Sequence, residues 1–368
     1  MRYIHELPTW PNFTWDTEAL SEKLAAVRHR QGRLIGRMEG LGFSLKTEAS
    51  LQYLTTEILK SNEIEGHQLN RESIRSSIAR RIGLEVATLS PPDREVEGLV
   101  EMMLDATGNY SDKLSASRLY GWHSCLFPTG RSGLTKICVG KWRGEKSGPM
   151  QVVSGPMGRE RIHFEAPAAS RLRQEMKRFI TWCNSEQKMD GVIKAAVVHL
   201  WFVTIHPFED GNGRIARALT EMQLARSEAC PQRFYSMSNQ IAQERNAYYQ
   251  ILEQTQKGDP NITAWITWFL DCLDRAFTGA EDLLGNVLQK ARFWERFGQE
   301  SLNPRQRTIL NRLLDGFEGK LTSSKWAKLG KCSQDTATRD INDLVLRGLL
   351  TKNKGGGRST SYAIGEVE

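Results

Sequence analysis

The residues best placed to do chemistry lie in one short stretch, residues 206–217, which reads HPFEDGNGRIAR. His206 can accept a proton near neutral pH, and Asp210 offers the carboxylate oxygens that Mg²⁺ prefers. Arg214 and Arg217 are three residues apart, so they share one face of a helix, and guanidinium groups bind phosphate oxygens in pairs. The stretch predicts a base beside a polyphosphate site.

Two helices are expected to hold this stretch in place. Residues 192–205 are apolar almost all round, which is typical of a buried helix of about four turns. Pro207 disfavours helical geometry at the residue before it, so this helix should end at His206. A second helical pattern covers residues 214–226, and the glycine turn before it leads into its first turn. The unpaired N–H groups and positive dipole end of such a helix bind phosphate.

Each of these residues also has a purely structural interpretation. A histidine before a proline commonly caps a helix or packs in the core, and a pair of arginines on a helix is commonly a solvated face. The two glycines and the four chemical residues occur together in twelve positions, and that joint occurrence favours a functional site.

The whole stretch resembles the signature of the Fic family, H-P-F-x-[DE]-G-N-[GK]-R-x-x-R. Its fixed positions are all matched, by His206, Pro207, Phe208, Asp210, Gly211, Asn212, Gly213, Arg214 and Arg217. The resemblance implies transfer of AMP from ATP to a Tyr, Thr or Ser hydroxyl of a target protein or of the chain itself. It also implies a mainly α fold, with a Fic-type helical core and a β-hairpin flap.

The resemblance further implies a role for each matched residue. His206 would be the catalytic base, Asp210 the Mg²⁺ ligand and Phe208 a core anchor. The backbone around Asn212 would hold the α-phosphate, and the two arginines the β- and γ-phosphates. The implied nucleotide-binding residues of this stretch are Asp210, Gly211, Asn212, Gly213, Arg214, Ile215, Ala216 and Arg217.

A second motif precedes the first by about 150 residues. Ser61 and Glu65 are four residues apart on one face of a predicted helix, and Gly66 is placed to end that helix. The spacing resembles the inhibitory motif of Fic proteins, [ST]-x-x-x-E-[GN], in which the glutamate reaches the second arginine of the active site. Glu65 is therefore expected to contact Arg217 and to hinder the γ-phosphate of ATP. As a bare pattern the motif also occurs by chance on solvated helices.

Two short β-like runs, residues 150–155 and 161–166, flank a turn and predict a β-hairpin. In the Fic family a hairpin here is the flap that lays the target segment beside the histidine. Val152, Val153 and Ser154 would form the target-positioning part of that flap, with Val153 as the clamp and as part of the nucleotide site. A valine packed on the hairpin's own core is the alternative.

Aromatic residues are predicted on the helical pattern at residues 236–259. By resemblance, Tyr248 and Tyr249 line the adenine and ribose pocket, and Gln256 lies near a further nucleotide contact. Tyrosine has a stacking face with a polar tip, which suits adenine. Paired tyrosines on an amphipathic helix also serve as half-buried packing residues.

Composition agrees with an ordinary globular protein. The chain has 368 residues, of which 39% are hydrophobic and 25% charged, and a net charge of +7. Its first residues lack the apolar core of a signal peptide, and no run is long enough for a membrane helix, so we expect a cytoplasmic protein. Six cysteines without a CxxC pair indicate neither a disulfide framework nor a zinc site.

The expected domain organisation has four parts. Residues 1–88 form a helical extension with the inhibitory helix, residues 89–280 the catalytic core, and residues 281–302 a helical linker. Residues 303–368 have the pattern of a winged helix-turn-helix, with helices at 304–316, 323–331 and 334–348 and a two-stranded wing. Bacterial Fic proteins often form homodimers, so a homodimer is a further expectation.

The C-terminal part carries +5 of the net charge of +7. That concentration favours nucleic-acid binding. Helix 334–348 would present Gln334, Thr336, Thr338 and Arg339 to the major groove, and the wing would place Lys352, Lys354 and Arg358 on the backbone. Winged helices also serve as protein–protein modules, and that alternative stays open.

Other functions fit the same residues. Related proteins transfer phosphate or other phosphate-bearing groups, although Gly213 weighs against kinase-like use, because members with that chemistry commonly carry lysine there. A glutamate placed like Glu65 could also orient water for removal of AMP. Finally, the chain could be a DNA-binding regulator in which the nucleotide site only senses.

Overall fold

The computed structural model describes residues 2–84, 94–145, 148–155, 159, 161–314, 317, 319–353 and 360–365. The chain divides into two compact units. Unit 1 comprises Met1–Gly40 and Ser50–Ala280, and unit 2 comprises Leu41–Ala49 and Glu281–Glu368. Among the described residues, no helix is both long enough and apolar enough to cross a bilayer.

Unit 1 is built on two helices that pack extensively against each other, α7 (Gly191–Ile205) and α8 (Asn212–Glu228). From Val192 to Ile205 every side chain of α7 is buried except that of Lys194, as expected for a helix that is apolar on all sides. Asp190 caps the helix by accepting the N–H of Val192. The predicted helix pair is confirmed. His206 and Asp210 lie in the six residues between the helices, and Arg214 and Arg217 lie in α8.

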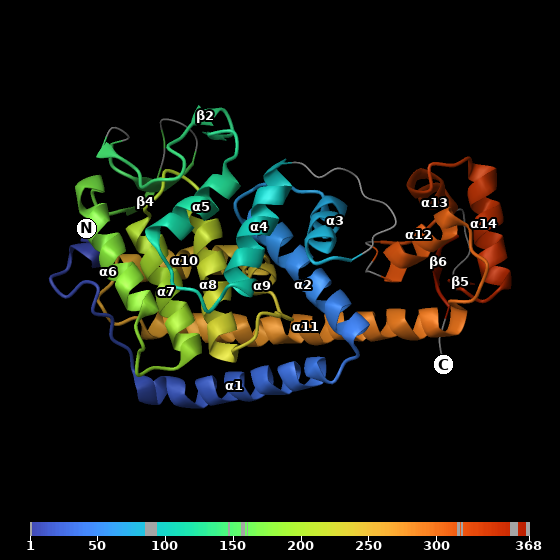
Figure 1. The fold of residues 1–368 in the computed structure, drawn as a ribbon, viewed down its shortest axis with the longest axis horizontal. Coiled ribbons are helices and arrows are strands. Elements are labelled where there is room, and N and C mark those ends of the chain that lie inside the picture. The colour runs from blue at the N-terminus through green and yellow to red at the C-terminus, as the bar shows by residue number, and fades with distance from the viewer. Residues whose placement is uncertain are drawn as a thin grey trace. The chain divides into compact units, whose positions relative to one another are not determined.

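Other helices cover this pair (Figure 1). Helices α4, α5 and α8 contact one another, and α6 packs on α7. The single helical pattern predicted at 236–259 is two helices, which break at Glu244. Their bounds are α4 Arg94–Gly108, α5 Ala116–Leu126, α6 Leu172–Asn184, α9 Met237–Gln243 and α10 Arg245–Gln256.

The N-terminal segment wraps around unit 1. After a 3-10 turn, η1 (Ile4–Glu6), the buried side chain of Trp10 packs edge-on against Trp201 of α7. Helix α1 (Thr17–Glu39) then runs beside the first part of α11, held by an ion pair of 2.6 Å from Lys23 to Asp271. Two more helices follow, α2 (Phe43–Ile64) and α3 (Arg71–Arg81).

Two small antiparallel hairpins belong to unit 1. Strands β3 (Gln151–Ser154) and β4 (Arg161–Glu165) form the predicted flap hairpin, with a register shift between Val152 and Val153. Strands β1 (Arg131–Ser132) and β2 (Thr135–Lys136) were not predicted. Each has only two residues, too few to leave a period-two pattern in the sequence.

Unit 2 has its own core around Trp326, Ile341 and Leu310. The long helix α11 (Thr263–Phe297) leads into it and covers most of the predicted helical linker. Thr322 and Ser333 cap the second and third short helices, as the hydroxyl-bearing residues at those positions predict. The elements are α12 Pro304–Leu314, α13 Ser323–Leu329, α14 Gln334–Leu346, β5 Leu350–Lys352 and β6 Tyr362–Ile364. The predicted wing residues Lys354 and Arg358 lie outside the described residues.

Candidate active site

His206 ends α7 in an unusual backbone conformation. Its φ of 49° lies in the left-handed region, and its N–H still donates to the carbonyl of Phe202 at 3.0 Å. Its ring Nδ1 lies 3.2 Å from the carbonyl oxygen of Val203. Because a carbonyl oxygen can only accept, Nδ1 carries the hydrogen and Nε2 keeps a free lone pair. The ring is therefore in the tautomer that a base at Nε2 requires.

The imidazole is also kept neutral. Burial lowers the pKa of His206 to about 4, and the positive charge of Arg143 acts in the same direction. The carboxylates of Glu65 and Asp210 oppose this shift without overcoming it. At physiological pH the ring is unprotonated and can accept a proton.

The loop after His206 is held by its own side chains. The Asn212 amide accepts the N–H of Phe208 at 3.0 Å and donates to the carbonyl of the same residue at 2.9 Å. The Phe208 ring is fully buried and stacks on His123 with 4.1 Å between ring centroids. Gly211 has a φ of 80°, and an added Cβ would lie 2.9 Å from the ring of Phe127. Glycine is thus required at that turn.

Asp210 is the acidic group of the loop. Its carboxylate accepts the N–H of Gly211 at 2.6 Å and the hydroxyl of Ser132. The side chain is half-buried. Among the described residues no group of three His, Cys, Asp or Glu side chains is arranged to hold a metal ion, so a cation at Asp210 would need oxygen ligands from elsewhere.

Arg214 is buried in the first turn of α8 with little to neutralise it. Only 2% of the residue is exposed, and the nearest bonded partner is the amide oxygen of Asn62, 3.5 Å from Nη1. Its Nε has no partner among the described residues. The guanidinium carbon lies 5.0 Å from the centroid of the Phe127 ring. Burial lowers the pKa of Arg214, although the carboxylates of Asp210 and Glu65 act in the opposite direction.

Arg217 is buried to the same degree but has a carboxylate partner. Its Nη2 lies 2.8 Å from Oε1 of Glu65, and its Nε donates to the hydroxyl of Ser61 at 2.8 Å. Burial opposes the charge of Arg217, but the carboxylate of Glu65 outweighs this and raises its pKa. Glu65 and Arg217 are therefore in contact, as the spacing of the second motif predicts.

Glu65 also covers the start of α8. A Cβ atom added at Gly213 would lie 2.2 Å from Oε1 of Glu65, well inside van der Waals contact. The carboxylate can approach the first turn of α8 this closely only because residue 213 is glycine. It lies where the positive end of the helix attracts anions. Gly66, with a φ of 85°, turns the chain away directly afterwards.

This geometry coincides with a known sequence family. Residues 113–224 match the Fic/DOC family, and residues 3–84 match a domain of unknown function, DUF4172. Over these residues, 113–224, the chain has the sequence pattern of the Fic/DOC family. The match includes α7, the loop and most of α8, so the loop described above is called the Fic loop from here on.

Part of the chain is similar to proteins named Protein adenylyltransferase Fic. The relative from Culex quinquefasciatus is 37% identical over 102 residues, covering 27% of this chain and 19% of that protein. The relative from Drosophila melanogaster is 34% identical over 111 residues, covering 30% of this chain and 21% of that protein. The chain thus spans about a fifth of the length of these curated relatives.

Solved structures share the fold. A Fic family protein from Desulfovibrio desulfuricans G20 superposes with a TM-score of 0.54 at 18% identity, covering 95% of this chain and 97% of that one. A Fic domain containing signaling protein from Bacteroides thetaiotaomicron gives a TM-score of 0.52 at 21% identity, covering 70% of this chain and 96% of that one. At these identities the likeness concerns the fold.

Three further residues that were predicted to bind the nucleotide lie in α10 and differ in their surroundings. Tyr248 is 2% exposed, and its hydroxyl lies 2.8 Å from Nε2 of His199 in the core. Tyr249 is 38% exposed and reaches the carbonyl of Ile64 at 3.5 Å, beside the inhibitory motif. Gln256 donates to Thr204 at 3.3 Å. Of the two tyrosines, only Tyr249 presents a ring to solvent.

The remaining predicted residues have simpler surroundings. Ile215 and Ala216 are fully buried in α8 and can offer a ligand only backbone groups. On the flap, Val153 is 49% exposed and pairs with Ile162 of β4. Val152 and Ser154 lie on the same strand, and the Ser154 hydroxyl hydrogen-bonds to His163 at 2.5 Å.

Sequence reasoning missed four residues that hold the Fic loop. Asn62 contacts Arg214, and Ser132 contacts Asp210. His123 packs on Phe208, and Arg143 binds the carbonyl of His206 at 2.8 Å. Asn62 stands next to Ser61 in the inhibitory motif, which was a usable signal. The other three come from the segment 123–143, in which no periodicity points to the loop.

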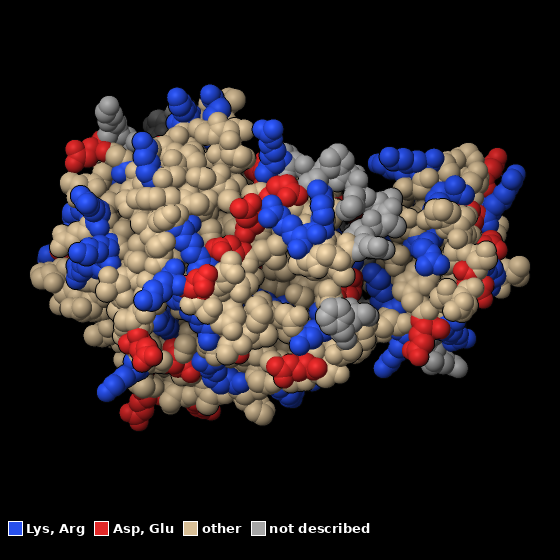
Figure 2. Space-filling view, viewed as in Figure 1, with Lys and Arg blue, Asp and Glu red and all other residues tan. Residues whose placement is uncertain are grey.

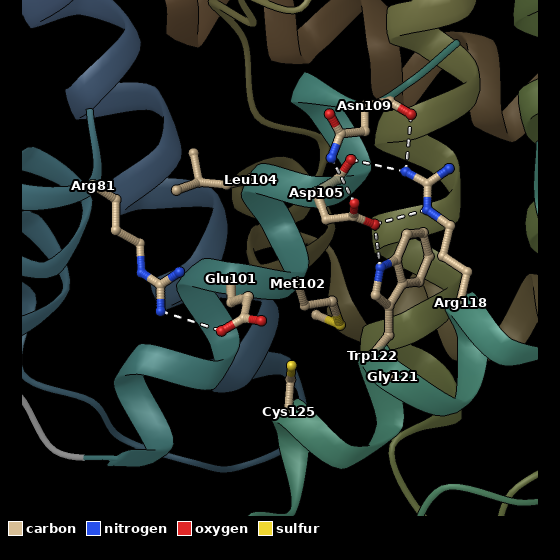
Figure 3. A pocket seen from close by; sticks show the side chains of 10 residues that line it. All are labelled: Arg81, Glu101, Met102, Leu104, Asp105, Asn109, Arg118, Gly121, Trp122 and Cys125. Atoms are coloured by element: carbon tan, nitrogen blue, oxygen red, sulfur yellow. Dashed lines mark hydrogen bonds and ion pairs between the residues drawn. The ribbon is translucent and has the colours of Figure 1, made fainter. Parts of the chain in front are cut away.

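A cavity of about 480 Å³ lies between α4 and α5, and none of its lining residues belongs to the Fic signature (Figure 3). Its charged groups neutralise one another: Arg81 pairs with Glu101 at 3.2 Å, and Arg118 with Asp105 at 2.7 Å. Trp122 donates to the same Asp105 carboxylate at 2.7 Å. No charge is left over for a ligand, so we assign this cavity no part in the site.

Proposed function

We propose that this protein transfers AMP from ATP to a Tyr, Thr or Ser hydroxyl of target proteins and of itself. The observation that carries the proposal is Arg214, a buried guanidinium without a carboxylate partner among the described residues, in the first turn of the helix that the loop joins to a neutral histidine. A buried charge of this kind calls for an anion from outside the chain. The names of the relatives support ATP as that anion.

In the proposed reaction, His206 removes the proton from the target hydroxyl as its oxygen attacks the α-phosphorus of ATP. A new bond forms between that oxygen and phosphorus. The bond from the α-phosphorus to the oxygen bridging it to the β-phosphorus breaks, and pyrophosphate leaves. The proton stays on Nε2 of His206 until solvent removes it. Arg214 and Arg217 balance the charge that develops on the leaving group, which is the main catalytic need in phosphoryl chemistry.

The residues present are compatible with Mg²⁺. In nucleotide sites this ion is commonly held by one or two carboxylates together with phosphate oxygens and water, so a single carboxylate suffices. Asp210 is the residue that would hold it, and the hydrogen bonds from Gly211 and Ser132 orient that carboxylate. Bound there, the ion would neutralise phosphate charge.

The same site is proposed to be restrained by Glu65. The glutamate occupies one side of Arg217 and lies against the first turn of α8 at Gly213. ATP would bring further negative charge to the same groups, so the carboxylate and the γ-phosphate compete. We expect slow transfer by the wild-type protein and faster transfer once Glu65 is moved or removed.

Two further surfaces are proposed, one for the adenine of ATP and one for the target segment. The exposed ring of Tyr249 is the better of the two tyrosines for stacking on adenine, and the buried Tyr248 would support it from below with a centroid distance of 5.1 Å. Among the described strands, β3 pairs only with β4. The other edge of β3, at Val152, Val153 and Ser154, can pair with the backbone of a target segment.

The test is label transfer with two forms of ATP. We expect the protein to label itself or a lysate protein from α-³²P-ATP, and expect no label from γ-³²P-ATP. His206→Ala should abolish the α-label while leaving ATP binding measurable by calorimetry. A label from the γ position would instead indicate a kinase, and binding without any label in either case would indicate a sensor.

We also propose, as a second function, that unit 2 binds duplex DNA. Ala337, Ile341 and Leu344 of α14 are buried, whereas Gln334, Thr338 and Arg339 are exposed on the other side, as a helix that reads base edges requires. Figure 2 shows basic and acidic side chains interspersed on the visible face, so base contacts by α14 should matter more than a uniform positive field.

Selection from a random duplex pool tests this second proposal. A recovered sequence should bind in a gel-shift assay and lose affinity about 10-fold or more with Arg339→Ala. His206→Ala should bind the same sequence normally. Recovery of no sequence above background would favour a protein–protein role for unit 2.

A further inference from the structure

Arg143 lies in the segment between β2 and β3 and reaches back to the Fic loop. The residue is 4% exposed. Its Nε donates to the carbonyl oxygen of His206 at 2.8 Å, and its backbone N–H donates to the carbonyl of Pro207 at 2.9 Å. Its Nη2 donates to the carbonyl of Pro167 at 2.5 Å. One residue therefore binds two successive carbonyls of the loop and a third from another part of the chain.

The third carbonyl belongs to the base of the flap. Pro167 is buried and follows β4 by two residues. The loop supplies the proposed base and the flap the proposed surface for the target. Arg143 bridges them through backbone atoms, whose positions are less free than those of side chains. Its contacts thus fix one proposed reactant surface relative to the other.

Keeping a charged group at this position is costly. No carboxylate pairs with Arg143 among the described residues, and burial lowers its pKa to about 10. An uncompensated guanidinium inside a protein costs free energy unless its donors are all used. Here Nε binds the carbonyl of His206 at the end of α7, where helix carbonyls lack partners in the helix itself, and Nη2 binds the carbonyl of Pro167. The planar guanidinium holds these two donors in a fixed relative orientation.

The backbone that Arg143 binds is strained at His206. His206 has φ 49° and ψ 59°, a conformation that residues with a Cβ rarely adopt and that costs free energy. Fixing the carbonyls of His206 and Pro207 fixes the peptide planes on the C-terminal side of the imidazole. The direction of the ring depends on those planes and on the hydrogen bond from Nδ1 to Val203.

We propose that Arg143 is a positioning residue for AMP transfer: it locks His206 in its left-handed conformation and sets the distance between Nε2 and a hydroxyl carried on the flap. This inference rests on the proposed function. Arg143 touches no reactant in this scheme. It acts on the geometry of the base, so loss of Arg143 should slow the chemical step. The affinity for ATP should not change, because the proposed phosphate-binding arginines lie in α8.

The kinetic test uses Glu65→Gly as the parent, in which transfer is expected to be fast enough to measure. Arg143→Gln should lower kcat by about 10- to 100-fold, the cost of misplacing a reacting group by an ångström or less. The KM for ATP should change by less than about 2-fold. A rise in KM would require loss of a contact that binds ATP equally in the ground state and the transition state, and Arg143 makes no such contact in this scheme. Arg143→Lys keeps the charge and one donor, and should recover part of kcat.

Arg226 offers a matched control. It is a half-buried arginine of unit 1 that, like Arg143, donates to backbone carbonyls, those of Tyr110 at 2.6 Å, Asp112 at 2.7 Å and Cys183 at 3.4 Å, and burial lowers its pKa as well. Arg226→Gln should lose stability much as Arg143→Gln does, with kcat unchanged. If both variants lower kcat equally, or if Arg143→Gln raises the KM for ATP as much as it lowers kcat, the positioning role is wrong.

A spectroscopic readout separates this inference from the proposed function. In ¹⁵N-histidine-labelled protein, the ring nitrogens of His206 should show the form with hydrogen on Nδ1, assigned by comparison with His206→Asn. Arg143→Gln should raise the share of the other tautomer several-fold, and Arg226→Gln should not. This result needs no AMP transfer, so an inactive parent would refute the proposed function alone, whereas an unchanged tautomer ratio would refute the role of Arg143.

Discussion

Two arginines of the same core show opposite ways of burying a positive charge. Arg233 is 0% exposed and pairs with Glu221 at 3.0 Å and with Glu228, while its guanidinium lies 4.4 Å from the ring of Tyr235. Arg214 is 2% exposed and has no carboxylate partner. Both keep one nitrogen without a hydrogen-bond partner among the described residues, Nη2 and Nε respectively. The missing hydrogen bonds therefore do not distinguish them, and the missing negative charge does.

The comparison shows which of the two buried arginines already has its negatively charged partners. We call the surroundings of Arg233 the complete region and those of Arg214 the incomplete region. The carboxylates around Arg233 outweigh its burial and raise its pKa, whereas burial lowers the pKa of Arg214. Arg217 is intermediate, because its single carboxylate, Glu65, comes from the turn after α2 and is 29% exposed. Among the described residues, Arg143 and Arg226 also lack a paired carboxylate, but they bind backbone carbonyl oxygens instead. Arg214 has only the amide oxygen of Asn62, at 3.5 Å, so a stronger partner is expected from solution.

The largest effect should come from the complete region. Arg233→Leu would leave Glu221 and Glu228 buried without a cation, and breaking a buried pair in this way costs about 3–5 kcal/mol. Arg214→Leu removes a charge that no carboxylate among the described residues pairs with and that Asp210 and Glu65 stabilise only in part, so it should be neutral or stabilising. Urea unfolding followed by circular dichroism measures both. Equal destabilisation by the two variants would show that Arg214 also has a structural partner.

The next largest effect should be on ligand binding at the incomplete region. In the Glu65→Gly background, Arg214→Leu should weaken ATP binding by roughly 10- to 150-fold, the value of a charge-assisted hydrogen bond of about 1.5–3 kcal/mol. Calorimetric titration with ATP measures it. Arg214→Lys, which keeps the charge but not the paired donors, should fall in between. Unchanged affinity for ATP in the leucine variant would mean that the anion expected at Arg214 is not a nucleotide phosphate.

A smaller effect is expected at Arg217, which has one partly exposed carboxylate partner. Glu65→Gly frees Arg217 and the first turn of α8, so AMP transfer should rise about 10-fold, the size of a single charge-assisted contact. Glu63→Gly is a suitable control, because it adds glycine in the last turn of α2, and the exposed Glu63 is paired with the half-buried Lys60 at 2.7 Å. Transfer of the α-label reports both rates. A rise in the control as large as in Glu65→Gly would point to loosening of α2 in general.

The sequence predicted those features of the site that depend on residues close together in the chain. Pro207 predicted where α7 ends, the glycines predicted the turn, and the spacing of Arg214 and Arg217 predicted their common face. Glu65 was also predicted to reach Arg217, because a short motif recorded that distant contact. The same reasoning placed the helices and strands of unit 2 to within a few residues, since caps and β-like runs are local signals too.

What the sequence did not predict depends on contacts between distant segments. Nothing near Arg143 indicates that its side chain ends at the carbonyl of His206, and nothing near Arg233 indicates two buried carboxylates. Tyr248 and Tyr249 are adjacent and alike, yet one is buried against His199 and the other half-exposed, because α10 turns by about 100° per residue. Which of them faces a ligand is decided by packing.

The smallest effect concerns the histidine beside the incomplete region. Burial and Arg143 lower the pKa of His206 to about 4, so at pH 6 only about 1% of the free protein should carry an imidazolium there, against about three-quarters for an ordinary histidine of pKa near 6.5. The ring signals of His206 should therefore hardly move between pH 8 and pH 6. Protonation would appear only as the pH falls toward 4.

Bound ATP should change this in a defined direction. Phosphate charge near the ring stabilises the imidazolium, so ATP raises the pKa of His206, whereas Glu65→Gly removes a carboxylate that already raises it and should lower the pKa in the free protein. A ¹⁵N titration of the free and ATP-bound protein measures both shifts. If ATP left the titration of His206 unchanged while still binding, the phosphates would lie too far from the base for the proposed reaction, and the partner of Arg214 would have to be sought in another anion.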